Sequence, residues 1–173
     1  MLKFMFGVAL IAVGTSALAQ IPVRNVPIMY GFVPDVSQLE MLDGEMLKTR
    51  VRGKTIAGIY GLTMHDDQRY TETLSADGAL SYRERDFTSV GRWFVKGDKL
   101  CFAYTGARSA LYCFYEFEYG SCTISFPDTT PLVNGKPVDP SDWTSVQIYV
   151  DADFKWPEDP SQEDALVCRF STV

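Results

Sequence analysis

Short, largely apolar segments separated by polar turn residues fill the middle of the chain, from residue 55 to residue 126. These segments are rich in β-branched and aromatic residues, and turn signals interrupt them about every 8 to 12 residues, a pattern typical of antiparallel β-sheet. The pattern predicts an all-β domain, an antiparallel up-and-down meander that forms a barrel or a strongly curved sheet. Strands are expected at 55–62, 69–75, 80–85, 90–95, 99–104, 111–118, 122–126 and 145–154.

The dipeptide Asp77-Gly78 marks one hairpin. A two-residue loop of type I′ has φ > 0 at both positions, which Asp and Gly tolerate. The resulting register places Glu72 opposite Arg83. Cross-strand pairs of opposite charge are weakly stabilising, so the charges favour this register.

Gly97-Asp98 marks a second tight hairpin and predicts the register around two cysteines. Its two-residue loop places Phe94 opposite Cys101. The turn at 105–109 then brings Cys101 opposite Cys113, where Cβ atoms about 4.5–5.5 Å apart approach disulfide geometry. The register therefore favours a disulfide between these two cysteines.

The chain has four cysteines, Cys101, Cys113, Cys122 and Cys168. In an oxidising compartment this even number indicates two disulfides. The competing interpretation is a zinc site, but the spacing contains no Cys-x2-Cys knuckle. With Cys101 paired to Cys113, the second bond joins Cys122 to Cys168 and ties the C-terminal tail to the sheet.

Residues 1–19 have the pattern of a cleaved secretory signal. Lys3 is followed by the apolar run 4–13, and Ala17-Leu18-Ala19 is a small-x-small cleavage pattern before Gln20. The alternative is a membrane anchor, but about 20 apolar residues are needed to span a bilayer and this run is shorter. We therefore expect a periplasmic or secreted protein with no membrane span after processing.

The charge balance narrows the range of partners. The 22 acidic and 16 basic residues give a formal net charge of −6, and the pI is near 4.7. Nucleic-acid binding needs a basic face that releases counterions, and an anionic membrane surface attracts basic proteins for the same reason. Neither is expected as a partner.

The N-terminal region before the sheet is expected to have two parts. Residues 20–34 contain three prolines and are expected to form an extended lead-in. Asp35 or Ser37 is expected to cap a short helix that runs through Met46 despite Gly44. The chain is accordingly divided into a signal at 1–19, the lead-in, and a single domain at 35–173.

Several short motifs resemble a known group of proteins. They are Leu47-x-Thr49, Gly53-Lys54-Thr55, Ala76-Asp77-Gly78, Gly91-Arg92-Trp93, Gly97-Asp98-Lys99-Leu100-Cys101 and a following Cys113. Together these motifs, over residues 38–126, resemble small secreted alphaproteobacterial proteins of unknown function with lipocalin-like character. The chain departs from the group at Cys113-Phe114, where Cys-Tyr is expected. The resemblance implies a lipocalin-like barrel and an exported location, and it implies no activity.

Two groups of polar residues are candidates for a catalytic or metal site, one around His65 and one at Glu116 and Glu118. His65 is the only histidine and no Gly-x-Ser-x-Gly motif accompanies it, so a hydrolytic triad is not expected. His65-Asp66-Asp67 is interpreted as a solvated turn in preference to a metal site. Glu116 and Glu118 share one face of a strand, as a carboxylate pair for glycoside hydrolysis does, but a solvated strand end is the favoured interpretation. No cofactor, metal or enzymatic activity is expected.

The aromatic residues are the most distinctive feature of the predicted sheet. One face carries Trp93, Val95, Leu100, Phe102, Tyr104, Tyr112 and Phe114, and the other carries Phe94, Cys101, Ala103, Leu111, Cys113, Tyr115 and Phe117. Both faces are apolar, so one is core and the other is covered or is a partner surface. An eight-stranded barrel has room for one small ligand.

The leading hypothesis is an exported, non-catalytic binding module for a small apolar or amphipathic ligand. The residues expected to contact this ligand are Trp93, Phe102, Tyr104 and Tyr112. The alternative is a periplasmic protein-interaction factor, either an inhibitor or an envelope assembly factor. That role would use the proline-rich loop 127–143 and an aromatic sheet face.

Overall fold

The computed structural model describes residues 23–28, 31–61, 69–106, 109–151, 153–156 and 167–171. The expected signal at 1–19 and the turn His65-Asp66-Asp67 lie outside the described residues.

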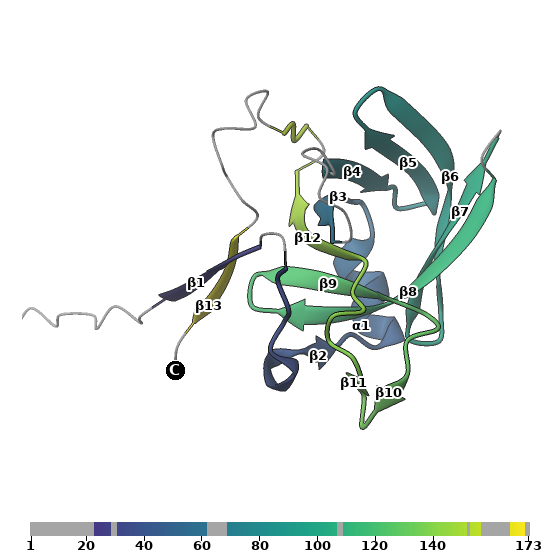
Figure 1. The fold of residues 1–173 in the computed structure, drawn as a ribbon. Coiled ribbons are helices and arrows are strands. Elements are labelled where there is room, and N and C mark those ends of the chain that lie inside the picture. Colours follow the sequence, from purple (N-terminus) through teal and green to yellow (C-terminus); the bar gives the residue numbers. More distant parts are fainter. Residues whose placement is uncertain are drawn as a thin grey trace, which may run out of the picture.

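The molecule is built around a closed, eight-stranded antiparallel barrel (Figure 1). Each strand pairs with the next along the chain, and β12 pairs with both β9 and β3, which closes the sheet. This arrangement confirms the predicted all-β, up-and-down, lipocalin-like fold. The barrel strands are β3 (Lys54–Tyr60), β4 (Arg69–Leu74), β5 (Ala79–Glu84), β6 (Phe87–Lys96), β7 (Lys99–Thr105), β8 (Ala110–Tyr119), β9 (Cys122–Pro127) and β12 (Ser145–Val150).

Shorter elements surround the barrel. Two strands that are far apart in sequence, β1 (Val23–Pro27) and β13 (Val167–Ser171), form an antiparallel ribbon beside it (Figure 1). β2 (Glu40–Met41) pairs with β8. β10 (Leu132–Val133) and β11 (Lys136–Pro137) form a small hairpin within the segment that was expected to be a long loop, and the helices are η1 (Val36–Gln38) and α1 (Gly44–Val51).

The N-terminal helix does not begin where the sequence analysis placed it. Asp35 caps only the three-residue 3-10 turn η1, and α1 begins at Gly44. The N-cap of α1 is Asp43, whose carboxylate accepts from the backbone N–H groups of Glu45 and Met46. The prediction was wrong because residues 40–41 pair with β8 and are held in extended conformation. This pairing separates η1 from α1.

Helix α1 closes one end of the barrel. Leu47 and Val51 on its inner side are fully buried. They pack with Leu42 against inward-facing residues near the same ends of the strands, namely Ile56, Leu74, Leu80, Trp93 and Leu100. Burial of such side chains stabilises the fold by about 1.5–3 kcal/mol each. This end of the barrel interior is therefore a packed core.

A second core lies outside the barrel, against β8, β9 and β12. Phe117, Ile124 and Val146 from these strands are fully buried beneath other parts of the chain. Trp143 covers them and its indole Nε1 donates to the carbonyl oxygen of Phe32 at 3.0 Å. The outer face of this part of the sheet is thus covered by the N-terminal segment and by the residues that follow β11.

The β4–β5 register differs from the prediction by one residue. Glu72 lies opposite Tyr82, and Arg83 pairs with Thr71. The loop is longer than two residues, and within it only Gly78 has a positive φ, of 87°. A slip of one residue moves a whole strand to the other face, and the expected register would have turned Arg83 of β5 toward the core. The register therefore follows the apolar positions of the two strands and not the opposite charges of Glu72 and Arg83.

The register of β6, β7 and β8 is the expected one. Trp93 lies opposite Phe102, and Cys101 lies opposite Cys113. Both predicted disulfides are present: Cys101 bonds to Cys113 across a Cα–Cα distance of 4.1 Å, and Cys122 bonds to Cys168 across 5.2 Å. The second bond joins the β1–β13 ribbon to β9. The last predicted strand, 145–154, ends earlier, at Val150.

Two strand glycines, Gly58 and the motif residue Gly91, occupy positions where a larger side chain would clash. A Cβ on Gly91 would lie 2.2 Å from the carbonyl oxygen of Ala103 on the neighbouring strand. A Cβ on Gly58 would lie 2.5 Å from the ring of Tyr70. Only glycine allows these close approaches.

No helix in the described ranges is both long enough and apolar enough to cross a membrane.

The two disulfides are expected to contribute unequally to stability. Replacing Cys122 and Cys168 together with alanine should lower the free energy of unfolding by about 4 kcal/mol, since this bond closes the longer loop. Replacing Cys101 and Cys113 should lower it by about 3 kcal/mol. Urea denaturation of both variants measures the losses. A greater loss from the shorter loop would contradict the loop-closure explanation.

Candidate ligand-binding cavity

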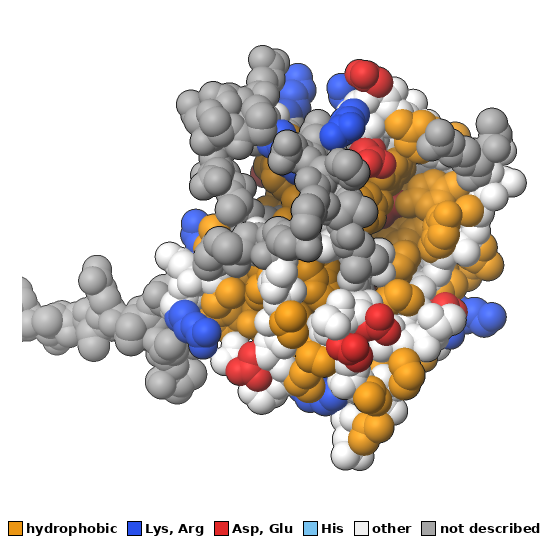
Figure 2. Space-filling model, viewed as in Figure 1, with side chains coloured by type: hydrophobic (Ala, Val, Ile, Leu, Met, Phe, Trp, Pro, Cys, Tyr) orange, Lys and Arg blue, Asp and Glu red, His pale blue; other side chains and the backbone are white. Residues whose placement is uncertain are grey.

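The end of the barrel interior opposite α1 is hollow. A cavity of about 500 Å³ is lined by side chains from all eight barrel strands. Figure 2 shows it from outside as a hollow whose visible walls are mostly hydrophobic. This volume lies within the range of small-molecule sites, about 300–1,000 Å³. The barrel thus contains a packed end and a ligand-sized end.

Strand alternation determines which residues line the cavity. In β4, for example, Tyr70, Glu72 and Leu74 all point inward. Leu74 belongs to the packed core above α1, whereas Tyr70 and Glu72 lie further along the strand and line the cavity. Gly58, on the adjacent β3, leaves the space that the Tyr70 ring occupies.

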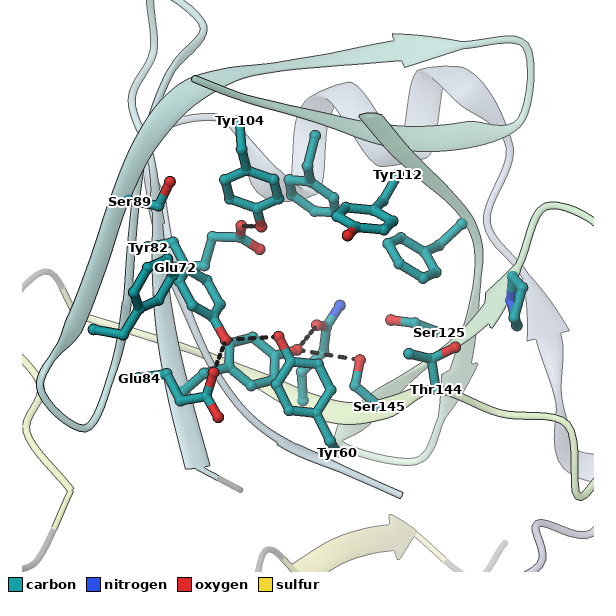
Figure 3. A pocket seen from close by; sticks show the side chains of 16 residues that line it. Tyr60, Glu72, Tyr82, Glu84, Ser89, Tyr104, Tyr112, Ser125, Thr144 and Ser145 are labelled. Atoms are coloured by element: carbon teal, nitrogen blue, oxygen red, sulfur yellow. Dashed lines mark hydrogen bonds between the residues drawn. The ribbon is translucent and has the colours of Figure 1, made fainter. Parts of the chain in front are cut away.

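An arc of aromatic rings forms one wall of the cavity (Figure 3). Tyr70 stacks on Tyr60 at 4.6 Å and on Tyr82 at 5.8 Å between ring centroids. Tyr82 then meets Tyr104 edge-on at 5.7 Å, and Tyr104 meets Tyr112 at 6.1 Å. Because each ring is held by its neighbours, the arc is a preformed apolar surface with polar tips.

A hydrogen-bonded network extends from Tyr70 in this arc to residues of β8, β9 and β12. The Tyr70 hydroxyl donates to Oε1 of Gln147 at 2.7 Å, and Nε2 of Gln147 donates to Oε2 of Glu116 at 3.1 Å. The Ser125 hydroxyl lies 2.9 Å from the same carboxyl oxygen of Glu116. Ser145 lies 3.2 Å from the Tyr70 hydroxyl. These buried polar groups therefore satisfy one another, as stable buried networks require.

Two tyrosine hydroxyls form a separate chain of hydrogen bonds. Tyr60 and Tyr82 are joined at 2.9 Å, and Tyr82 donates to Oε2 of Glu84 at 2.8 Å. Burial raises the pKa of both hydroxyls. They are accordingly neutral hydrogen-bonding groups at physiological pH.

Glu72 is the buried carboxyl that lines the cavity itself. Its exposed fraction is 4%, and the Tyr104 hydroxyl donates to its Oε1 atom. Within the part of the chain that is described, its other carboxyl oxygen has no hydrogen-bond partner. Burial raises the pKa of Glu72 to about 8, against the opposing effect of the hydrogen bond from Tyr104. Glu72 is therefore largely protonated at neutral pH in the empty cavity.

Glu116 is buried behind the cavity wall. It is fully buried, and this burial raises its pKa to about 8 although the hydrogen bond from Ser125 lowers it. The interpretation of residues 116 and 118 as a solvated strand end is wrong for Glu116. Glu118 instead forms an ion pair with Arg50 on α1, in which its carboxylate lies 2.8 Å from Nη2. The two carboxyls do not face a shared substrate position.

Three of the four expected ligand-contact residues line the cavity, namely Phe102, Tyr104 and Tyr112. Tyr112 lies at the mouth with 53% of its surface exposed. Trp93 instead belongs to the packed core near α1, and its Nε1 donates to the carbonyl oxygen of Ser75 at 2.8 Å. It is too far along its strand toward the closed end to line the cavity.

The sequence analysis did not identify Glu72 or the tyrosines of β3, β4 and β5 as site residues. A signal for Glu72 was present: it occupies the position between Tyr70 and Leu74 on the apolar side of a strand. A charged residue on such a face is unusual in a core. The wrong β4–β5 register, which paired Glu72 with Arg83, concealed this signal.

Fold and cavity together define the class of protein: a lipocalin-like β-barrel with a ligand-sized interior. No protein-family model, curated protein or solved structure matches the chain. Within the described ranges, no cluster of His, Cys, Asp and Glu is arranged to hold a metal ion. The chemistry of the cavity is thus that of its tyrosines, its amide and hydroxyl groups, and its carboxyls.

Stability is expected to fall as pH rises from about 4.5 to about 8. In this window the unfolded carboxyls are ionised while Glu72 and Glu116 stay protonated in the folded barrel, so folding takes up protons. Each carboxyl contributes a slope of at most about 1.4 kcal/mol per pH unit. Urea denaturation across this range measures the slope. The double variant Glu72→Gln, Glu116→Gln should flatten it, and an unchanged slope would contradict the assignment.

Proposed function

We propose that the chain is an exported, non-catalytic binding module that holds a small apolar or amphipathic ligand inside the barrel. The observation that carries the proposal is the hollow half of the barrel, a cavity of about 500 Å³ beside a well-packed core. Natural interiors are close-packed and contain few voids larger than a water molecule. A preformed cavity of this size is the usual form of a small-molecule site.

The composition of the walls supports an amphipathic ligand. The aromatic arc provides flat apolar surface, and Glu72, Ser125 and Gln147 present polar atoms on other parts of the wall (Figure 3). A mostly apolar pocket with a few placed polar groups orients its ligand through those groups. Tyr104 and Tyr112 line the side of the cavity where the sequence analysis expected ligand contacts.

Export is part of the proposal. The signal-like residues 1–19 and two disulfides support passage into an oxidising compartment. We also propose that the chain belongs with the small secreted proteins that its motifs resemble. In support, two motif residues have defined structural roles: Gly91 approaches β7 closely, and the Trp93 backbone N–H donates to the Gly78 carbonyl at 3.0 Å.

The first test is native mass spectrometry of the protein purified from its own periplasm. A bound small mass is expected on the wild-type chain. Ser89 lines the cavity from β6, so Ser89→Trp should fill the space and abolish the bound mass. The matched control is Thr88→Trp, which places the same side chain on the exposed outer face of the same strand. Equal binding by both variants would contradict a site inside the barrel.

A second candidate function, capture of an envelope protein, is favoured by one specific observation. The β10–β11 hairpin extends from the barrel (Figure 1), and its two valines are exposed: Val133 by 60% and Val138, just after β11, by 59%. Exposed apolar side chains on a projecting hairpin are typical of interaction sites when they are contiguous. This role would use the segment 127–143.

The two functions are separated by substituting both valines. Val133→Ser with Val138→Ser should leave the bound small mass unchanged, because neither residue lines the cavity. If the protein acts through this hairpin, crosslinking in the periplasm should yield an adduct in the wild type that the double variant loses. Loss of the small mass with retention of the adduct would contradict both assignments.

A further inference from the structure

The charged side chains that line the cavity are all acidic in the part of the chain that is described. Glu72 and Glu84 contribute carboxyls, and no Lys or Arg is among the described lining residues. Resting on the proposed function, we propose that the ligand is a small organic cation, a protonated amine on a compact apolar group. Its ammonium would bind the Glu72 carboxylate, and its apolar part would lie against the tyrosine arc.

Glu72 has the unused hydrogen-bonding capacity that such a ligand needs. An ionised carboxylate has about four acceptor positions on its two oxygens. Tyr104 donates to one oxygen of Glu72, and the other has no partner among the described residues. Figure 3 shows the Glu72 carboxyl directed into the cavity next to Tyr104. An ammonium can donate up to three hydrogen bonds, which are stronger when both partners are charged.

The aromatic rings favour the same charge. The faces of aromatic rings carry partial negative charge, and a cation within about 6 Å of a ring centroid is attracted to it. Tyr82 and Tyr104, whose centroids are 5.7 Å apart, lie on the side of the cavity from which Glu72 projects (Figure 3). A cation at Glu72 would therefore interact with ring faces as well as with the carboxylate.

An anionic ligand such as a fatty acid fits this cavity poorly. Its carboxylate would meet acidic groups and neutral tyrosines, and the described lining offers no cationic side chain to pair with it. Glu84 already accepts from Tyr82, and Glu116 is bound by Ser125 and Gln147. Glu72 is the buried carboxyl of the lining, and one of its oxygens accepts no hydrogen bond from the described residues.

Binding of an ammonium is expected to release a proton. In the empty cavity Glu72 is protonated at neutral pH, so formation of the ammonium–carboxylate pair sends one proton from Glu72 to solvent. Among the described residues, none of the groups that face or electrostatically influence Glu72 is basic. They are Tyr60 on β3, Tyr70 on its own strand, Tyr82 and Glu84 on β5, Tyr104 on β7 and Glu116 on β8. Affinity for the amine should therefore rise between about pH 6 and about pH 8.

Isothermal titration calorimetry with three matched probes tests the proposal. The probes are 2-phenylethylamine, the neutral 2-phenylethanol and the anionic 3-phenylpropanoate, which share a phenyl ring and differ in charge. The amine should bind about tenfold more tightly than the alcohol, and the carboxylate most weakly. Titration in buffers of different ionisation enthalpy should show about one proton released per bound amine and none per bound alcohol.

Two isosteric variants assign the effect to one carboxyl. Glu72→Gln should reduce the affinity for the amine about tenfold, to that for the alcohol, and abolish proton release. Glu118→Gln is the matched control, because Glu118 does not line the cavity and its carboxylate pairs with Arg50 on α1. It should change the affinity for the amine by less than about threefold. The proton count of the wild type requires no variant and remains informative if a variant does not fold.

The outcomes separate the two levels of the proposal. If the alcohol or the carboxylate binds as tightly as the amine, and Ser89→Trp abolishes that binding, the cationic ligand is refuted while the binding module stands. If the folded wild type binds none of the three probes and carries no copurified mass, both proposals fail. Loss of amine affinity in Glu118→Gln equal to that in Glu72→Gln would overturn the assignment to Glu72.

Discussion

β12 pairs with β3 on one edge and with β9 on the other, and this pairing determines the shape of the barrel interior. It closes a meander that would otherwise end in two open edges. Closure with eight strands creates an interior whose width the strand number largely determines, and inward side chains must either fill this interior or leave space. Every feature of the candidate site follows from the way this interior is divided.

The division runs across the barrel axis. At the end that α1 closes, large aliphatic side chains such as Leu74 and Leu100 fill the space. At the other end, the inward positions of β9 and β12 carry the small or polar residues Ser125, Ser145 and Gln147, so a cavity remains. The same strands thus contribute to a stable core and to a binding site, and α1 separates the core from solvent.

Buried acidic groups are difficult to explain by stability alone. Replacing a buried polar group with an apolar one of similar size is often neutral or stabilising, and Glu72 and Glu116 both have a pKa raised by burial. Glu116 at least satisfies a network with Ser125 and Gln147. Glu72 has one tyrosine partner and lines the cavity, which is the expected arrangement for a polar group that orients a ligand.

Sequence reasoning predicted the features that depend on local pattern. The meander, the β6–β7–β8 register and the Cys101–Cys113 disulfide followed from turn residues and strand register, because neighbouring strands along the chain are neighbours in the barrel. The Cys122–Cys168 bond was predicted only as the remaining pair. The start of α1 was missed because β2 pairs with the distant β8. Trp93 and Phe102 share a face, yet only Phe102 lines the cavity, since depth along the barrel axis depends on closure and on α1.

In the proposed mode of binding, the Glu72 carboxyl at the hollow end of the barrel changes its protonation when the cavity binds an ammonium. Carbon-13 NMR of the glutamate side-chain carboxyls, titrated with pH, tests this claim most directly. Glu72 should titrate near pH 8 in the ligand-free protein and at a clearly lower pH when 2-phenylethylamine is bound. Titration of Glu72 near its ordinary value in the empty protein, with no change on adding the amine, would contradict it.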